Sequence, residues 1–342
     1  MSEELFRAVG GRPVDRPHLL AAVGGIGAAG AAAWNFGVAP KTDAVRTMIQ
    51  AKPTLYAARP DLAGKWDGST TVNHYLAVQA AAKAQGFDPL SLIQMQPRGT
   101  CGGRAGSATG DVAQCIAVAA GLKAKVHRVS HAAVYFAARK KYDMLRGDPN
   151  DENNDGVASG SVPEALSSVA GYVQREQDGD DNYYGQGSDD LAVQLGCGLL
   201  PDVQQKILAA GAHTFITWAP VKSAQELADG IAAGGVGIGS DGQGFTMQRD
   251  ADGFCRPSGT WQHYQTRVAV GTWNGRKGFG YWQSWGRDTP TGTPLAGLPG
   301  NCFGVDWDVQ DQVIRSGDWA VVFSFPFWDV DQSPADLSFV FQ

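Results

Sequence analysis

The sequence predicts an α+β protein in which helices come first and strands follow. In the first two thirds of the chain, capping residues precede apolar residues that recur at three and four positions, a spacing typical of amphipathic helices. Later in the chain, short runs rich in branched and aromatic residues alternate with Gly, Pro and Asp turns. Because the two kinds of element are segregated along the chain, we expect two packed halves that meet at a cleft.

Helix signals occur in four stretches. The first predicted helix begins at Cys101 and ends at Gly121. The second covers residues 130–146, the third covers residues 161–173, and the fourth runs from Ser223 to Gly234. The third and fourth open with capping boxes, Ser161 with Glu164 and Ser223 with Glu226. Four strands are then predicted: VGIG from Val236, RVAVGTW from Arg267, FGYWQSW from Phe279 and WAVVFSF from Trp319.

These elements divide the 342 residues into three parts. Residues 1–75 carry few periodic signals and form an irregular N-terminal extension, residues 76–212 form the helical half, and residues 213–342 form the strand-rich half. The 28 basic and 34 acidic residues give a net charge of −6, and no basic block or platform of aromatic residues with Arg is present. This composition argues against a nucleic-acid partner.

The five cysteines are far apart and include no CxxC pair, which argues against zinc and thioredoxin-type redox chemistry. The stretch DENNDG places Asp151, Asn153 and Asp155 at alternate positions, as in the first half of a calcium loop. The twelfth position of such a loop is Val162 rather than glutamate, so a solvated linker is favoured over a metal site. We therefore expect no metal and no organic cofactor.

The stretch GTCGGRAGS sets Cys101 among glycines at the start of a predicted helix. The positive end of a helix dipole lowers the pKa of a thiol, and the thiolate is the nucleophilic form. The flanking glycines let a substrate backbone come close. The alternative is that Cys101 is a small buried residue at a tight turn.

A second stretch, residues 259–286, contains a histidine beside a predicted strand and a later Gln-Ser-Trp-Gly sequence. His263 is suited to take the thiol proton and return it to a leaving amine. The side-chain oxygen of Gln283 is then expected to hold the imidazole, and Trp285 to shield that hydrogen bond from water. Taken separately, His263 could equally be a surface strand residue and Trp285 a core residue.

Together these stretches resemble the papain-like cysteine peptidase family, in particular its bacterial and phage members. The resemblance covers residues 90–325 and includes the nucleophile motif with Gly99, Thr100 and Gly102, and the Ser284, Trp285 and Gly286 that follow Gln283. It implies a two-lobed fold, with a helical lobe and a β-barrel-like lobe. It also implies that Cys101 is the nucleophile, His263 the base and acid, and Gln283 the replacement for the family's usual asparagine.

The resemblance also implies an upstream glutamine that donates its amide to the oxyanion, beside the N–H of the nucleophile. Such a donor is worth about 3 kcal/mol of barrier. Gln96 is the better placed residue for this role, and Gln94 is the second. The family usually has tryptophan where this chain has Gly102. Gly271 lies two residues farther from His263 than is usual, which predicts either a bulge or a different edge strand.

The implied activity is thiol-dependent hydrolysis of peptide or amide bonds, with a peptide or protein as substrate. One alternative is a papain-like structural protein of a virion with weak or no catalysis, which the small-residue arm Leu19–Ala33 and the two extra residues between His263 and Gly271 favour. Residues 303–324 also resemble the C-terminal tail that some phage relatives carry. A third function is that of an amidase acting on cell-wall peptide.

The segment from Leu19 to Trp34 follows three arginines and has the outline of a signal peptide. Its apolar residues are mostly Ala and Gly, and it is shorter than the ~20 residues of a membrane span. We expect Leu19–Ala33 to be an arm that packs on the chain or joins copies of it in a homo-oligomer or a virion. A leader or membrane-active segment is the alternative, and both the bacterial cytoplasm and a virion stay open as the location.

Overall fold

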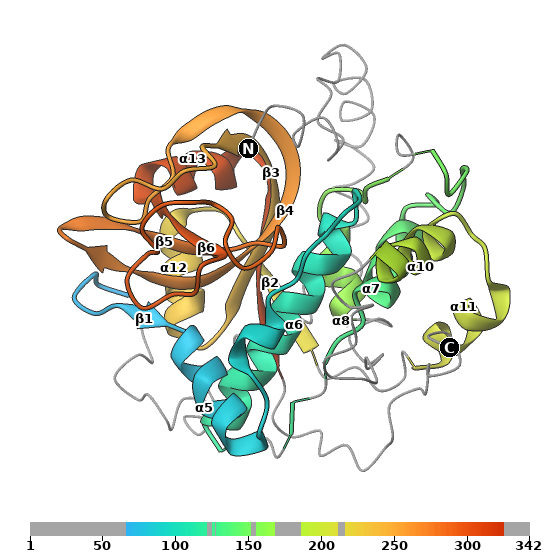
Figure 1. Ribbon diagram of the computed structural model, residues 1–342, viewed down its shortest axis with the longest axis horizontal. Helices are drawn as coiled ribbons and strands as arrows, with labels where there is room; N and C mark the ends of the chain where they lie inside the picture. The colour runs from blue at the N-terminus through green and yellow to red at the C-terminus, as the bar shows by residue number, and fades with distance from the viewer. Residues whose placement is uncertain are drawn as a thin grey trace.

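The computed structural model describes residues 66–121, 125–126, 128–151, 155–167, 186–210 and 216–324. Within these residues, helices gather on one side and an antiparallel sheet on the other (Figure 1). The predicted α+β class is therefore confirmed. The arm Leu19–Ala33 lies outside the described residues. None of the described helices combines the length and the apolar character that crossing a membrane requires.

The helical half is built around one long central helix. The helices are α5 (Tyr75–Gln85), the short 3₁₀ helix η3 (Pro89–Leu92), α6 (Cys101–Ala119), α7 (His131–Lys141), α8 (Ser161–Ser167), α10 (Gln186–Gly196) and α11 (Pro201–Ala210). Helix α6 is buried from Gly102 to Cys115 and lies between the sheet and helices α7, α8 and α10 (Figure 1). Its small residues let both neighbours approach closely, so the start of α6 is held at the junction of the two halves.

The sheet half contains seven strands among the described residues. They are β1 (Val72–Asn73), β2 (Ile216–Val221), β3 (Val236–Phe245), β4 (Pro257–Trp273), β5 (Arg276–Trp282), β6 (Cys302–Asp306) and β7 (Asp318–Ser324), in the order β2-β7-β3-β4-β5-β6 with β1 paired to β4. Helices α12 (Ala224–Ala232) and α13 (Trp307–Ser316) pack on this sheet. Residues 303–324 supply most of edge strand β6, helix α13 and strand β7, which lies between β2 and β3.

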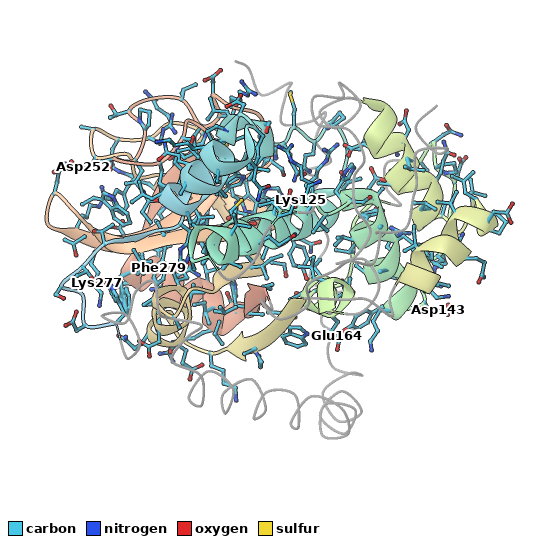
Figure 2. All side chains as sticks on the ribbon, turned by 90° about the horizontal axis from the view of Figure 1, so that it is seen from below. Lys125, Asp143, Glu164, Asp252, Lys277 and Phe279 are labelled. Atoms are coloured by element: carbon cyan, nitrogen blue, oxygen red, sulfur yellow. The ribbon has the colours of Figure 1, made fainter. Side chains whose placement is uncertain are left out.

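An aromatic stack fastens the start of the described chain to the sheet half. Phe279 of β5 stacks on Trp307 with ring centroids 5.2 Å apart, and Trp307 stacks on Trp66 at 5.4 Å. The Nζ of Lys277 lies 3.3 Å from the centroid of the Trp307 ring, a cation–π contact. Figure 2 shows Lys277 and Phe279 on the sheet side of the molecule, away from Asp143 and Glu164 of the helical half.

Two of the predicted helices are confirmed at both ends. Helix α6 begins at Cys101 and ends at Ala119, and Gly121 follows with a left-handed φ of 70°. Helix α12 forms half of the predicted capping box: the N–H of Glu226 donates to Ser223 Oγ at 3.2 Å. The Glu226 carboxylate accepts from the N–H of Lys222, one residue before the cap, at 2.8 Å.

The helix predicted over residues 130–146 is too long, because α7 ends at Lys141. The chain then turns at Asp143, which has a φ of 53°. The turn lets the Arg139 guanidinium donate to the carbonyl groups of Met144 and Arg146, at 2.8 and 3.3 Å. These hydrogen bonds replace further helical turns and fold the chain back around a buried arginine.

The third predicted helix is α8, which begins at Ser161 and is described as far as Ser167. Its capping box is not formed, because Ser161 Oγ donates to the carbonyl of Ala158 at 2.6 Å instead of accepting from the Glu164 N–H. The boundary at residue 75 stays a prediction, although α5 begins at Tyr75 and β1 of the extension pairs with β4.

The four predicted strands correspond to β3, β4, β5 and β7, and β4 begins earlier than predicted. His263 therefore lies inside a strand rather than beside one. The pairing of β4 with β5 shifts register between Arg267 and Ala269, which is the bulge that the long spacing to Gly271 predicts. Strand β3 has a second irregularity between Asp241 and Gln243, opposite the part of β4 that holds His263.

Candidate active site

The first turn of α6 lies against the middle of β4. A Cβ atom added to Gly102 would be 3.5 Å from the Tyr264 ring, and Thr266 Oγ1 donates to the carbonyl of Ala105 at 3.1 Å. Because helix and strand run alongside each other over these contacts, the structure brings Cys101 together with the segment of His263, although 162 positions separate them in the chain. The side chains that contact α6 here are those of Tyr264 and Thr266, and no hydrogen bond joins His263 Nε2 to the Cys101 sulfur. A direct pairing of Cys101 with His263 therefore stays a prediction.

Cys101 is the half-buried first residue of α6. Burial raises the pKa of its thiol, whereas the backbone N–H groups of Tyr264 and Gly102 act in the opposite direction and offset part of the shift. The net direction is opposite to that expected from the helix position alone, because desolvation disfavours the thiolate more than the nearby N–H groups favour it. The resting sulfur is therefore a neutral thiol at neutral pH.

His263 is enclosed by two indole rings. It stacks on Trp285 with ring centroids 4.5 Å apart and planes 16° apart, and the edge of Trp261 approaches at 5.8 Å. Only 5% of His263 is exposed, so it is not a surface residue. Burial, with a contribution from the charge of Arg267, lowers the pKa of His263 to about 3. The imidazole is neutral at neutral pH, and burial makes it a weaker base than an exposed histidine.

Gln283 is buried, but it does not make the predicted hydrogen bond to His263. Its Nε2 donates to the carbonyl of Thr289. Gln283 Oε1 and His263 Nε2 are both buried, and neither has a hydrogen-bond partner among the described residues. The side chain, one methylene longer than asparagine, is held by Thr289 and leaves the imidazole unsupported on this side. Trp285 stacks on the imidazole, but the hydrogen bond that it was predicted to shield is not formed.

A short antiparallel ladder joins the segment before Cys101 to the segment after β5. The N–H of Gln96 donates to the carbonyl of Ser284 at 2.8 Å, and the N–H of Gly286 donates to the carbonyl of Gln94 at 3.0 Å. Between these bonds, Met95 and Trp285 form an isolated β-bridge. The ladder fixes the cover of His263 relative to the approach to the nucleophile.

The two glutamines of this ladder point in different directions. Gln94 is 1% exposed, and its Nε2 donates to Ser107 Oγ inside the helical half at 3.2 Å. Gln96 accepts from Ser284 Oγ through Oε1 and donates from Nε2 to the carbonyl of Arg98 at 3.0 Å, which leaves a second N–H on the same nitrogen. The oxyanion role of Gln96 stays a prediction.

Two glycines of the nucleophile motif allow close approach. A Cβ on Gly99 would lie 2.6 Å from the Cβ of Asp155, whose carboxylate accepts from the Gly99 N–H at 3.1 Å. A Cβ on Gly102 would lie 2.4 Å from Val157 Cγ2. Val157 therefore fills the volume beside Gly102, where the family usually has a tryptophan.

Asp155, one of the calcium-like residues, binds protein groups instead. Its carboxylate accepts from the Arg98 guanidinium and the Gly99 N–H, at 3.3 and 3.1 Å. Asn153 lies outside the described residues. No group of three His, Cys, Asp or Glu side chains that could hold a metal ion occurs in the part of the chain that the structure describes.

Sequence reasoning missed four residues of this region: Met95, Trp261, Asp155 as an anchor, and Asp189. Trp261 precedes His263 by two positions in a strand, so the period of two could have placed it on the same face. Met95 is 50% exposed in the ladder beside Trp285. Asp189 approaches Thr100 from α10, 89 positions away, and no local spacing indicates that contact.

No protein-family model and no curated protein match the sequence. Among solved structures, the chain is similar to xylellain, a cysteine protease from Xylella fastidiosa, with a TM-score of 0.46 and 12% identity over 78% of this chain and 89% of that one. It is also similar to digestive procathepsin L 3 of Tenebrio molitor larval midgut, with a TM-score of 0.43 and 14% identity over 77% and 71% of the two chains. A third similar structure is proCathepsin B S9 from Trypanosoma congolense, with a TM-score of 0.42 and 8% identity over 76% of this chain and 78% of that one. Because these TM-scores are below 0.5, the function is inferred from this chain's own residues.

Proposed function

We propose that this protein is a papain-like cysteine hydrolase that cleaves peptide or amide bonds with Cys101 and His263. The observation that carries the proposal is the contact between the first turn of α6 and β4, where the Tyr264 N–H lies close enough to the Cys101 sulfur to affect its pKa. Tyr264 follows His263 directly in β4, so a thiol and a buried, neutral imidazole share one neighbourhood. Covalent acyl transfer requires the thiol and the imidazole to come within hydrogen-bond reach, and in the resting structure His263 Nε2 has no hydrogen-bond partner among the described residues. The proposed reaction therefore requires the two side chains to come together when substrate binds.

In the proposed reaction, His263 takes the thiol proton as the Cys101 sulfur attacks the carbonyl carbon. The N–H of Cys101 and the Nε2 of Gln96 donate to the oxyanion. His263 then gives the proton to the leaving amine as the C–N bond breaks, and a thioester remains on Cys101. His263 next deprotonates a water molecule, which attacks the thioester and releases the acid and the thiol. No metal or organic cofactor enters this sequence.

The test uses the full chain with a fluorogenic peptide library and with casein. Cys101→Ala is expected to abolish hydrolysis, and His263→Ala to lower kcat/KM by at least about 10³-fold, since triad members act as a unit. Cys255→Ala is the matched control, because Cys255 is buried in the sheet half and plays no part in the proposal. Hydrolysis that survives in Cys101→Ala would exclude the proposed chemistry.

A second experiment separates peptidase from cell-wall amidase. Both activities use the same thiol and imidazole, so the substrate alone distinguishes them. Incubation with casein and with peptidoglycan, followed by mass spectrometry of the released fragments, identifies the bond that is cut. Release of peptides from peptidoglycan alone would assign the amidase function.

One observation favours the alternative of a weakly active or inactive papain-like structural protein, such as one associated with a virion. His263 Nε2 and Gln283 Oε1 are buried without hydrogen-bond partners among the described residues, so the imidazole lacks a group that orients it. Iodoacetamide labelling at neutral pH discriminates the two functions. Labelling of Cys101 that is fast and depends on His263 supports an enzyme, whereas labelling as slow as that of Cys255 supports a structural protein.

A further inference from the structure

Two buried carboxylates hold the three residues that precede Cys101. Asp189 of α10 accepts from the N–H of Arg98 at 3.1 Å and from the hydroxyl of Thr100 at 2.8 Å. Asp155 accepts from the N–H of Gly99 at 3.1 Å and from the Arg98 guanidinium at 3.3 Å. Two consecutive backbone N–H groups and the next side chain are thus fixed from two separate parts of the helical half.

The bond from Thr100 to Asp189 also determines how α6 begins. Thr100 is the residue that caps this helix, and threonine at such a position ordinarily accepts a hydrogen bond from the first turn. Here no side chain caps α6, because the Thr100 hydroxyl donates to Asp189 instead. The carbonyl of Thr100 still accepts from Arg104 at 3.1 Å, so the helix itself is intact. The N–H groups of the first turn therefore have no side-chain cap, and they point toward the end of the helix where Cys101 lies.

The charge of Asp189 is balanced inside the helical half. The Arg104 guanidinium lies 2.7 Å from its Oδ1, and His131 Nε2 lies 3.6 Å from the same oxygen. Burial alone raises the pKa of Asp189, but hydrogen bonds from His131 and Thr100 and the charge of Arg104 outweigh it and hold the pKa at about 2. The same negative charge slightly disfavours a thiolate at Cys101. Asp189 therefore cannot assist Cys101 through its charge, and its contribution must come from position.

We propose that Asp189 is a positioning residue for Cys101, which acts by accepting from the Thr100 hydroxyl and the Arg98 N–H and so fixing the segment before Cys101, with Asp155 as the second anchor. The proposal rests on the proposed function, because the segment that is fixed in this way carries the proposed nucleophile. A displacement of about 1 Å in a reacting or positioning group is enough to lower the rate of the chemical step roughly 10²-fold.

Thr100→Val and Thr100→Ser form the decisive pair. Valine has nearly the shape of threonine without the hydroxyl, whereas serine keeps the donor to Asp189. Thr100→Val is expected to lower kcat for peptide hydrolysis about 10-fold with KM unchanged, and Thr100→Ser to retain most of the activity. Asp189→Asn, which loses the acceptor for the Arg98 N–H, is expected to lower kcat further. Equal kcat values for Thr100→Val and Thr100→Ser would overturn the proposal.

Asp111→Asn is the matched control for loss of a buried carboxylate. Asp111 is on the same helix as Cys101, ten positions farther along the chain. Its Oδ1 accepts from the N–H of Val129 at 2.7 Å. Its substitution is expected to lower the unfolding midpoint without the selective fall in kcat. If kcat falls as much in Asp111→Asn as in Asp189→Asn, Asp189 only stabilises the fold, and the proposal is overturned.

Two readouts do not depend on peptide hydrolysis. Amide hydrogen exchange of Arg98 is expected to be about 10-fold faster in Asp189→Asn than in Thr100→Ser, because only Asp189→Asn removes the acceptor of that N–H. Iodoacetamide labelling of Cys101 is expected to change in Thr100→Val and Asp189→Asn and not in Thr100→Ser. Unchanged exchange and labelling would overturn the positioning role, whereas a wild-type chain that cleaves no peptide would overturn only the proposed function.

Discussion

The imidazole of His263 lies flat on the indole of Trp285, with ring centroids 4.5 Å apart and ring planes 16° apart. Trp285 also forms the β-bridge to Met95, and the ladder around this bridge leads into the segment that carries Cys101. One indole therefore both excludes water from the proposed base and belongs to the connection between the two halves. Substitutions at Trp285 are expected to affect the protonation of His263 as well as catalysis.

Trp285→Ala is expected to raise the pKa of His263 from about 3 toward its ordinary value of 6.5, because water then reaches the imidazole. It is expected to lower kcat/KM by about 10 to 10²-fold and the free energy of unfolding by up to about 3 kcal/mol. Trp285→Phe keeps a stacked ring and serves as the control. NMR titration of the His263 ring protons measures the pKa, and a pKa that stays low in Trp285→Ala would contradict this account.

The buried, neutral state of His263 predicts a specific dependence of stability on pH. Its pKa falls from 6.5 to about 3 on folding, so between these values the unfolded chain binds a proton that the folded chain does not. The stabilisation is complete above pH 6.5 and is lost as the pH falls toward 3, with a slope of at most about 1.4 kcal/mol per pH unit. Denaturant unfolding of wild type and His263→Gln over this range measures the difference between the two curves. Parallel curves would show that His263 is accessible to protons in the folded state.

Local patterns were sufficient to predict the start of α6 and four strands, because a capping residue, a period and a turn each lie within a few positions. The length of α7 could not be predicted in this way, since its end depends on carbonyl groups that fold back onto Arg139. Strands β2 and β6 and helix α13 were not predicted, because short segments have little periodic signal and depend on pairing with β7 and β5.

The site shows the same division between local and tertiary information. Cys101 and His263 stand out by residue type and by neighbouring glycine and tryptophan residues, so motifs were enough to single them out. The direction of the Cys101 pKa shift was predicted wrongly, because the helix position is local whereas burial depends on the whole fold. The anchors Asp155 and Asp189 act across 56 and 89 positions, respectively, and carry no local signature.

Gln283→Ala is expected to lower kcat/KM by less than about 10-fold, because in the structure the Gln283 oxygen makes no hydrogen bond to the described residues that could be lost. Gln283→Asn shortens the side chain and removes the reach to the Thr289 carbonyl, which frees the amide to orient the imidazole. Its activity is expected to equal or exceed that of wild type. Steady-state kinetics on one fluorogenic peptide compare the variants. A loss of 10²-fold or more in Gln283→Ala would mean that Gln283 binds His263 during the reaction.

Gly99→Ala tests the close approach of Asp155 to the nucleophile motif. The added Cβ would lie 2.6 Å from the Cβ of Asp155, so the carboxylate must move away from the N–H of Gly99. We expect a loss of about 1–3 kcal/mol in the free energy of unfolding and about 10-fold in kcat/KM. Gly242→Ala is the control, because its nearest neighbour would be the Trp261 carbonyl at an ordinary 3.8 Å.

A double-mutant cycle separates this contact from a general effect of alanine at position 99. Asp155→Gly removes the Cβ that the new methyl group would meet, so adding Gly99→Ala in this background is expected to cost little further stability or activity. Such strong non-additivity is expected only for residues that touch. Denaturant unfolding and peptide hydrolysis of all four chains measure these losses. If the losses are additive, the cost arises from the backbone of Gly99, and Asp155 does not constrain Gly99.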